Sequence, residues 1–288
     1  MGRSALLTGV TGFLGGYTAR CLIADGWQVA AVVRTSSRTE LLPAAVREQI
    51  VFYDAEHMDL REIVREAAPD VVFHLATYYT TIHSYDEIDD LIASNVTFGT
   101  KLLDAMDRNN VRRLVYARSS WQHYRGDDYE PANLYAASKD AFDAIVRFYE
   151  AANGLQRIGL TLFDTYGEDD RRNKLLAVLP KIAAEGKRLA LSPGEQQVDF
   201  VHAEDVARAF ALAGSYLAEG RVELCGDYIV SSGTAVTLRE LIRRYECLRG
   251  GQMPVDWGAR PYRVREIMIP WRGGRILPGW ERKHKELM

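Results

Sequence analysis

Short apolar runs alternate with longer amphipathic stretches over the first 165 residues, and this alternation limits the fold more than any other feature. The apolar runs lie at 4–8, 28–33, 49–53, 71–75, 113–119 and 159–163. Helical patterns fall between them, near 13–25, 59–67, 86–109 and 133–153. Strands that alternate with helices form parallel sheets with helices on both faces. The sequence therefore predicts an α/β fold built on a doubly wound parallel sheet.

A glycine-rich turn, LLTGVTGFLGG, joins the first predicted strand to the first predicted helix. It contains Gly9, Gly12 and Gly15. Glycines allow a tight turn there and let backbone N–H groups approach a pyrophosphate at the helix N-terminus. The turn predicts a Rossmann-like dinucleotide-binding domain. Further expected cofactor contacts are Thr11, Phe13 and Leu14 in the turn, and Leu75, Ala76 and Thr77 after the fourth strand.

Basic residues follow the second predicted strand, which ends at Val33. An acidic residue at this point favours NAD, whereas an arginine can accommodate the 2′-phosphate of NADP. The chain has Arg34 here, with Ser36, Ser37 and Arg38 next to it. We therefore expect NADPH or NADP, with NAD as the less favoured cofactor and a solvated basic loop as the alternative interpretation. Asp54, after the third strand, is a candidate for the adenine amino group or a simple strand cap.

Composition excludes several other classes of protein. The formal net charge is -3, from 36 Lys and Arg against 39 Asp and Glu, so neither nucleic acid nor a membrane surface is expected as a partner. Three scattered cysteines and six histidines show no ligand spacing, so we expect no disulfide and no metal. We also expect no leader peptide or membrane helix, and a cytoplasmic location.

The segment YAASK places Tyr135 and Lys139 one turn apart on a predicted helix, so the two side chains share a face. A tyrosine, with a reference pKa of about 10, is a reluctant acid unless a group such as an ammonium stabilises its phenolate. Lys139 can also hold the ribose hydroxyls of the cofactor. Ser119 and Ser120 end the preceding strand, at the edge where open α/β sheets bind ligands. The pattern predicts a tyrosine proton donor and a serine that holds a carbonyl oxygen.

Six segments follow the order of a known family: TGVTGFLG, FHLA, SNVTFGTKLLDAM, YAASK, TLFDTYG and VDFVHAEDVARA. The chain resembles an extended short-chain dehydrogenase/reductase of the NAD(P)-dependent nucleotide-sugar epimerase/dehydratase family. This resemblance implies that Gly9, Gly12 and Gly15 bind the cofactor and that Tyr135 and Lys139 are catalytic. It places the catalytic serine most naturally at Ser120, with Ser119 as the alternative.

A narrower resemblance points to the CDP-abequose and CDP-paratose synthase group. It is carried by WQHY, LYAASK, LFDTYGEDDRRNKLL, SPGEQ and the tail PYRVRE…LPGW. It implies NADPH-dependent reduction of a keto group on a nucleoside-diphosphate deoxysugar, and C4 is the favoured position of that keto group. The alternatives are an epimerase or dehydratase with tightly bound NAD, and a dinucleotide-sensing protein without chemistry. The resemblance also suggests a homodimer, paired through the helices near 86–109 and 133–153.

Two departures from the family pattern affect the substrate side. Trp121 and Gln122 follow Ser120, where dehydratases of the family carry acid and base residues. Val198 stands where many relatives have an arginine for the nucleotide phosphates. Other residues must therefore contact the substrate, and the candidates are Thr77, Ser120, Gln122, Arg172, Lys174 and Arg263.

The chain after residue 163 is less regular. Helices are expected over 174–185 and in HAEDVARAFALA, and the last 65 residues, rich in Gly, Pro and Arg, are expected to form an irregular cap. We expect residues 1–165 to form the NADP-binding domain, rejoined by about 200–220. Residues 166–199 and 221–288 would then form the smaller substrate-binding region.

Overall fold

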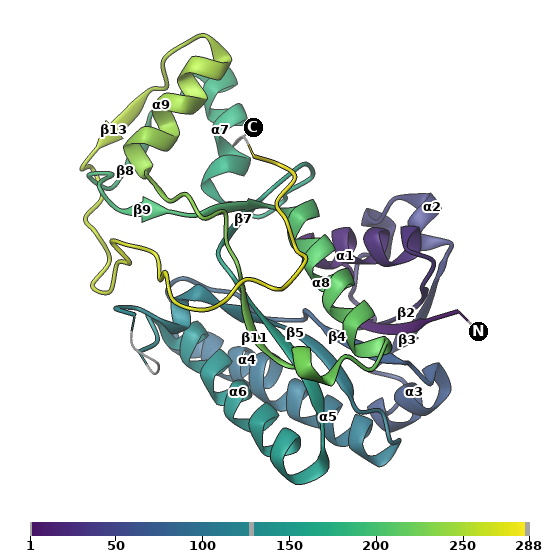
Figure 1. Cartoon of the computed structure of the whole chain (residues 1–288). Helices are drawn as coiled ribbons and strands as arrows, with labels where there is room; N and C mark the ends of the chain where they lie inside the picture. Colours follow the sequence, from purple (N-terminus) through teal and green to yellow (C-terminus); the bar gives the residue numbers. More distant parts are fainter. Residues whose placement is uncertain (1, 127–129, 286–288) are drawn as a thin grey trace.

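A computed structural model describes residues 2–126 and 130–285 of the chain. In these residues a seven-stranded parallel sheet has the order β3-β2-β1-β4-β5-β6-β11 (Figure 1). The strands are β1 (Ser4–Thr8), β2 (Gln28–Val33), β3 (Ile50–Asp54), β4 (Val71–His74), β5 (Arg113–Ser119), β6 (Gln156–Leu162) and β11 (Gly226–Val230). The chain reverses direction across the sheet between β1 and β4, which is where such folds form their ligand crevice.

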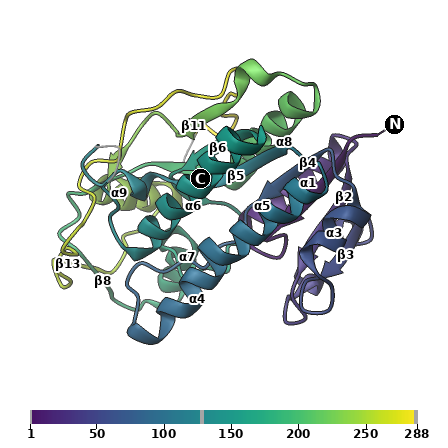
Figure 2. The same cartoon turned by 90° about the horizontal axis from the view of Figure 1, so that it is seen from below.

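Helices cover both faces of this sheet (Figure 2). One face packs against α1 (Phe13–Ala24) and α8 (Ala203–Ala218), around a core that includes Phe73 and Phe210. The other face packs against α3 (Leu60–Ala67), α5 (Phe98–Arg108) and α6 (Leu134–Asn153), around Leu102 and Phe142. The doubly wound α/β sheet predicted from the alternating pattern is confirmed.

The stretch predicted as one helix over 86–109 is divided into four segments. They are η2 (Tyr85–Glu87), α4 (Ile88–Ile92), the π-helical turn η3 (Ala93–Thr97), and α5. A π-helical turn inserts an extra residue into a helix and commonly occurs at functional sites. Here the turn contains Asn95, whose buried side chain contacts the segment after β4.

The smaller region has a core of its own, to which the last 65 residues, expected to form an irregular cap, contribute one helix and two short strands. It contains α7 (Leu175–Glu185), α9 (Leu238–Arg249) and three strand pairs: β7 (Asp164–Tyr166) with β10 (Phe200–His202), β8 (Leu189–Leu191) with β13 (Val255–Trp257), and β9 (Gln197–Val198) with β12 (Val236–Thr237). Leu179, Leu241 and Ile242 are buried in this core. The signal for α9 was present, because Leu238, Leu241, Ile242 and Tyr245 have helical spacing and Thr237 caps the helix.

The last part of the chain returns from the smaller region across the molecule to the sheet domain (Figure 1, yellow). The indole N–H of Trp280 donates to the carbonyl of Asp205, 2.9 Å away. The buried carboxylate of Asp205 accepts the backbone N–H groups of Lys283 and His284 at 2.9 and 3.0 Å. Asp205 therefore ties the tail to the start of α8. Within the described residues, no helix is long and apolar enough to cross a membrane.

Candidate active site

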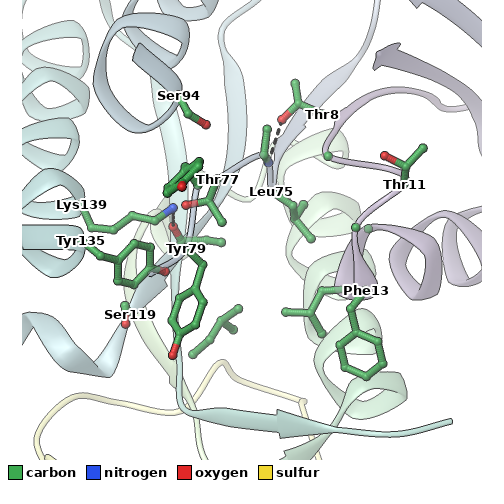
Figure 3. A pocket seen from close by; sticks show the side chains of 18 of the residues that line it. Thr8, Thr11, Phe13, Leu75, Thr77, Tyr79, Ser94, Ser119, Tyr135 and Lys139 are labelled. Carbon is green, nitrogen blue, oxygen red and sulfur yellow. Dashed lines mark hydrogen bonds between the residues drawn. The ribbon is translucent and has the colours of Figure 1, made fainter. Parts of the chain in front are cut away.

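A cavity of about 880 Å³ lies at the carboxyl ends of the strands, between the sheet domain and the smaller region. Its size is suited to a dinucleotide together with a small substrate. Figure 3 shows Tyr135, Lys139, Ser119 and Tyr79 gathered on one side and Phe13 on the other. Many of the site residues expected from distant parts of the sequence, though not all of them, therefore line one cavity.

The glycine turn forms the wall opposite the tyrosine. Gly9 has a φ of +78°, which favours glycine, and a Cβ there would lie 2.6 Å from the backbone nitrogen of Ala76. A Cβ on Gly15 would lie 1.9 Å from the carbonyl oxygen of Gly9. Thr11 and Gly12 line the cavity where α1 begins. The close approach of turn, strand and helix N-terminus fits a dinucleotide pyrophosphate.

At the other expected end of the cofactor, Arg34 and Ser37 line the cavity. Ser36, Arg38 and Asp54 are not among the residues that line it. The Asp54 carboxylate instead accepts the hydroxyl of Thr35 at 2.7 Å and the backbone N–H of Glu56 at 2.9 Å. Asp54 therefore holds the loop after β2 against the end of β3, while Glu56, which sequence reasoning missed, lines the cavity.

Tyr135 and Lys139 lie in the first turns of α6, where the side chain of Asn133 caps the helix by accepting the N–H of Ala136 at 2.9 Å. Both residues are buried: Tyr135 is 8% exposed and Lys139 is 4% exposed. The Lys139 ammonium donates to the carbonyl oxygen of Ala117 on β5, 3.3 Å away. The helix and the end of the central strand therefore hold the pair at the cavity wall.

Burial acts on the two groups in opposite directions. It raises the pKa of the Tyr135 phenol above its ordinary value, and hydrogen bonds with Ser119 and Thr77 oppose this rise. Burial lowers the pKa of Lys139 to about 8, against an attraction to Asp143 that raises it. Lys139 is thus still mainly protonated at neutral pH, while Tyr135 retains its proton and can act as a donor.

Asn95 and His74 support the segment that carries Thr77. The Asn95 amide oxygen accepts the Thr77 hydroxyl at 2.9 Å and the Tyr78 N–H at 2.7 Å, and its nitrogen donates to Ser138 on α6 at 2.9 Å. His74 is fully enclosed, with Nδ1 2.8 Å from the Thr8 hydroxyl, and burial lowers its pKa to about 3. His74 is therefore a neutral, hydrogen-bonded core residue.

Both candidate serines line the cavity. Ser119 hydrogen-bonds the Tyr135 phenol, and its oxygen also accepts the backbone N–H of Trp121 at 3.2 Å. Ser120 begins the short helix η4 (Ser120–Gln122) directly beyond. Gln122, expected at the substrate, is fully buried and hydrogen-bonded to protein groups instead. That expectation is corrected, because the turn of η4 directs the amide toward α6.

The three candidate cations differ in their surroundings. Arg172 lines the cavity and pairs with Asp170 at 2.7 Å. Lys174 also lines the cavity, and burial lowers its pKa. Arg263, in the tail, lies over the ring of Trp121 at 5.1 Å and pairs with Glu266 at 2.6 Å.

An aromatic group was missed as part of the site. The Tyr79 ring centroid lies 5.1 Å from that of Tyr135 and 5.8 Å from that of Trp121. Tyr79 lines the cavity, and its hydroxyl accepts a 2.7 Å hydrogen bond from Lys174. Sequence spacing could not find this contact, because the two residues are far apart in the chain.

A second group of polar residues lies outside this cavity. One nitrogen or oxygen from each of His202, Glu204 and His284 falls within 4.8 Å of the others, although their spacing in the sequence suggested no metal site. His202 Nδ1 accepts the N–H of Glu204 at 3.2 Å, so in the neutral ring Nε2 carries the hydrogen and faces Glu168 at 3.3 Å. Neither ring nitrogen of His202 then has a free lone pair, and the group serves to cap α8 and hold the tail.

The fold and this site together define an extended short-chain dehydrogenase/reductase. The NAD dependent epimerase/dehydratase family matches residues 5–225, most of the chain, and the protein belongs to that family. Its members modify nucleotide sugars, and the chain is accordingly an enzyme of this kind.

Several distant relatives match nearly the whole chain. A CDP-abequose synthase of Salmonella typhimurium is 23% identical, over 96% of this chain and 92% of its own. A UDP-glucose 4-epimerase of Streptomyces lividans is 25% identical, over 98% and 92%. Among solved structures, the UDP-glucose 4-epimerase of Brucella ovis in complex with NAD has a TM-score of 0.80 at 21% identity, over 94% and 90%. The relatives thus include a CDP-abequose synthase as well as UDP-glucose 4-epimerases.

Proposed function

We propose that the protein reduces a keto group, at C4, of a nucleoside-diphosphate deoxysugar with NADPH. The observation that carries this proposal is the arrangement within one cavity: Tyr135, Lys139 and two serines at one wall, and Arg34 with Ser37 at the adenosine end. When bound, the reduced nicotinamide supplies the hydride for the carbonyl carbon. The side chains of the protein itself donate the proton, orient the substrate oxygen and bind the two ligands.

The phenol of Tyr135 donates the proton that the developing alkoxide needs. Its raised pKa keeps the proton in place at neutral pH, and the Lys139 ammonium stabilises the phenolate once the proton has left. Ser120 or Ser119 donates a hydrogen bond to the same substrate oxygen. A tyrosine and a serine that converge on one oxygen stabilise charge where it develops.

Arg34 and Ser37 support NADPH as the cofactor. A guanidinium and a hydroxyl suit the 2′-phosphate, and Arg34 stands where an acidic residue would favour NAD. Glu56 also lines this part of the cavity, so the cofactor's adenosine meets one acidic group as well. Purified protein is expected to oxidise NADPH at least tenfold faster than NADH at equal low concentration, a preference of about 1.4 kcal/mol or more.

The substrate's diphosphate is assigned to Arg172 and Lys174, which line the cavity. Arg263 is not among the lining residues but lies over the ring of Trp121, which is. Lys174 is the most favourable of the three, because its ammonium already faces the cavity beside Tyr79. Val198, which replaces a family arginine, offers no charge to this task. Thr77, close to Tyr135 and Lys139, would contact the sugar or the ribose of the cofactor.

The second candidate function is epimerisation with retained NAD. It is favoured by the UDP-glucose 4-epimerases among the relatives, one of them 27% identical over 82% of this chain. Such an enzyme uses the same tyrosine and lysine, removes a hydride and returns it to the other face of the sugar. The amount and redox state of cofactor that copurifies with the protein distinguish the two.

The test is a direct assay with synthetic nucleotide 4-keto-6-deoxysugars and, separately, nucleotide hexoses. NADPH consumption in step with formation of a new sugar alcohol is expected for the keto substrates. Tyr135→Phe should lower turnover by about 10²- to 10⁴-fold while cofactor binding persists. Conversion of nucleotide hexoses without added reductant would instead establish the epimerase.

A homodimer through α4, α5 and α6 is also proposed. Phe148 on α6 and Ile92 on α4 are 60% and 38% exposed, large apolar side chains on the helices that the sequence suggested for pairing. Light scattering on the purified protein measures the mass, and Phe148→Glu should shift a dimer toward the monomer.

A further inference from the structure

A buried carboxylate, Asp143, lies one helical turn beyond Lys139 on α6 and is only 3% exposed. Its Oδ2 accepts a 2.8 Å hydrogen bond from Arg118 and a 2.7 Å hydrogen bond from Gln122. Both donors belong to the end of β5 and the short helix after it, the segment that carries the two serines. Asp143 therefore connects the helix of the tyrosine and lysine to the strand of the serines.

Gln122 transmits this connection to the serine turn. Its side-chain oxygen accepts the backbone N–H of Ser119 at 2.8 Å, while its nitrogen donates to Asp143 and to Asp140, each at 2.7 Å. The amide is completely buried, so these bonds have no competition from water. A shift of α6 along β5 would break them together.

Arg118 is the cation of the network. Besides Asp143, its guanidinium contacts the Thr161 hydroxyl at 3.2 Å and the Asp227 carboxylate at 3.6 Å. A glycine on β6 makes room for it, because a Cβ on Gly159 would lie 2.7 Å from the Arg118 side chain and 2.5 Å from Asp227. Glycine at position 159 thus leaves room where Arg118 meets Asp227.

We propose that Asp143 is a positioning residue: through Arg118 and Gln122 it fixes the serine turn against α6, and one helical turn away it is the anionic partner of Lys139. This inference rests on the proposed function only for the identity of the reaction. Asp143 touches neither substrate nor cofactor in this assignment. It acts through the bonds that join two elements and through its field at the lysine.

The electrostatic part has a definite sign. Asp143 raises the pKa of Lys139, whereas burial lowers it. Among the described residues, His74, which burial keeps neutral, and the Tyr135 phenol, which retains its proton, also lie beside Lys139. Removal of the Asp143 charge therefore lets the pKa of Lys139 fall further, and the lysine loses its proton at a lower pH.

The first measurement follows Lys139 itself in the cofactor-free protein. Lys139 is one of seven lysines in the chain, so its side-chain NMR signal can be assigned in lysine-labelled protein by its loss in Lys139→Met. Asp143→Asn is expected to lower its titration midpoint by about one pH unit or more. Asp143→Glu should restore most of the shift. An unchanged midpoint in Asp143→Asn overturns the proposal.

Asp227→Asn is the matched control. It removes the other carboxylate on Arg118 but leaves Asp143 beside Lys139. Both variants weaken the same buried arginine, so a general structural effect would move both titrations alike. The proposal requires that the titration midpoint of Lys139 falls in Asp143→Asn and equals the wild-type value in Asp227→Asn.

Turnover supplies the second readout. In the wild type the high-pH limb of kcat for ketone reduction should follow Lys139, and Asp143→Asn should move that limb to lower pH. Should Asp143→Asn fail to fold, Gln122→Met still tests the positioning: kcat is expected to fall about tenfold or more with little change in cofactor affinity. An unchanged kcat in Gln122→Met overturns it. Wild-type protein that titrates as described yet reduces no keto sugar contradicts the proposed function and leaves the network intact.

Discussion

The ammonium of Lys174 donates a 2.7 Å hydrogen bond to the hydroxyl of Tyr79, inside the cavity that also contains Lys139 and Tyr135. Lys174 is the residue directly before α7, and Tyr79 lies in the segment after β4. The smaller region and the sheet domain are thus joined at the wall of the site. An anionic substrate group that binds Lys174 would meet both parts of the molecule at once.

Lys174→Met is expected to raise KM for the nucleotide sugar about 10- to 100-fold. A charge-assisted hydrogen bond contributes about 1.5–3 kcal/mol, and methionine keeps the length of the side chain without its charge. The control is Lys181→Met on α7, whose side chain is 76% exposed and is not part of the cavity lining. Steady-state kinetics at saturating NADPH measures both. Equal KM values in wild type and Lys174→Met would remove Lys174 from substrate binding.

Arg34→Asp is expected to lower kcat/KM for NADPH by about 100-fold and to leave NADH use much less affected. The substitution replaces a phosphate-binding cation with a repelling anion. Arg38→Asp should have the smaller effect, because the Arg38 side chain is 69% exposed and pairs with Glu40 at 3.2 Å. The measurement is the ratio of kcat/KM for NADPH to kcat/KM for NADH in the wild type, Arg34→Asp and Arg38→Asp. If this ratio is the same in Arg34→Asp as in the wild type, the NADP assignment is wrong.

Lys139→Met is expected to stabilise the folded protein by about 1–3 kcal/mol at neutral pH while it abolishes turnover. Burial lowers the pKa of Lys139 from 10.5 to about 8, so the folded state disfavours a proton that the unfolded state keeps. This cost to the wild type is complete below pH 8 and disappears as the pH rises toward 10.5. Urea unfolding at pH 7 and pH 9.5 should show the advantage of the methionine variant shrinking at the higher pH.

Asn95→Ala is expected to reduce the free energy of unfolding by about 2–4 kcal/mol and to lower kcat. The substitution leaves the partly buried N–H of Tyr78 without its acceptor and releases Thr77 and Ser138. Asn109→Ala serves for comparison, because this asparagine ends α5 at the surface and bonds only to backbone carbonyls. Similar losses in the two variants would mean that the π-helical turn has no special role.

Much of the sheet domain was predictable because its signals are local. Gly9 and Gly15 are required where strand, helix and neighbouring backbone meet, and this requirement is written in the spacing of the glycines. Tyr135 and Lys139 share a helix, so their relative placement follows from helical geometry alone. Parallel strands likewise read as apolar runs whatever their order in the sheet.

The parts that were missed depend on contacts between distant segments. Gln122 looked like a substrate ligand beside Ser120, yet the bend of η4 turns its amide toward Asp143. The core around Leu241 was overlooked because α9 packs against α7, more than fifty residues earlier in the chain. A sequence pattern indicates which face of a helix is apolar but not what covers that face.

By itself, the sequence determined the wound sheet, the glycine turn and the tyrosine–lysine pair, because each depends on residues within one or two turns or strands of each other. Only the tertiary structure decided that Lys174 meets Tyr79, that Arg118 meets Asp143, and that Arg34 rather than Arg38 lines the cavity. These contacts are set by how packed elements cross, and packing is a property of the whole chain. The local spacing of residues in the sequence therefore does not predict this packing.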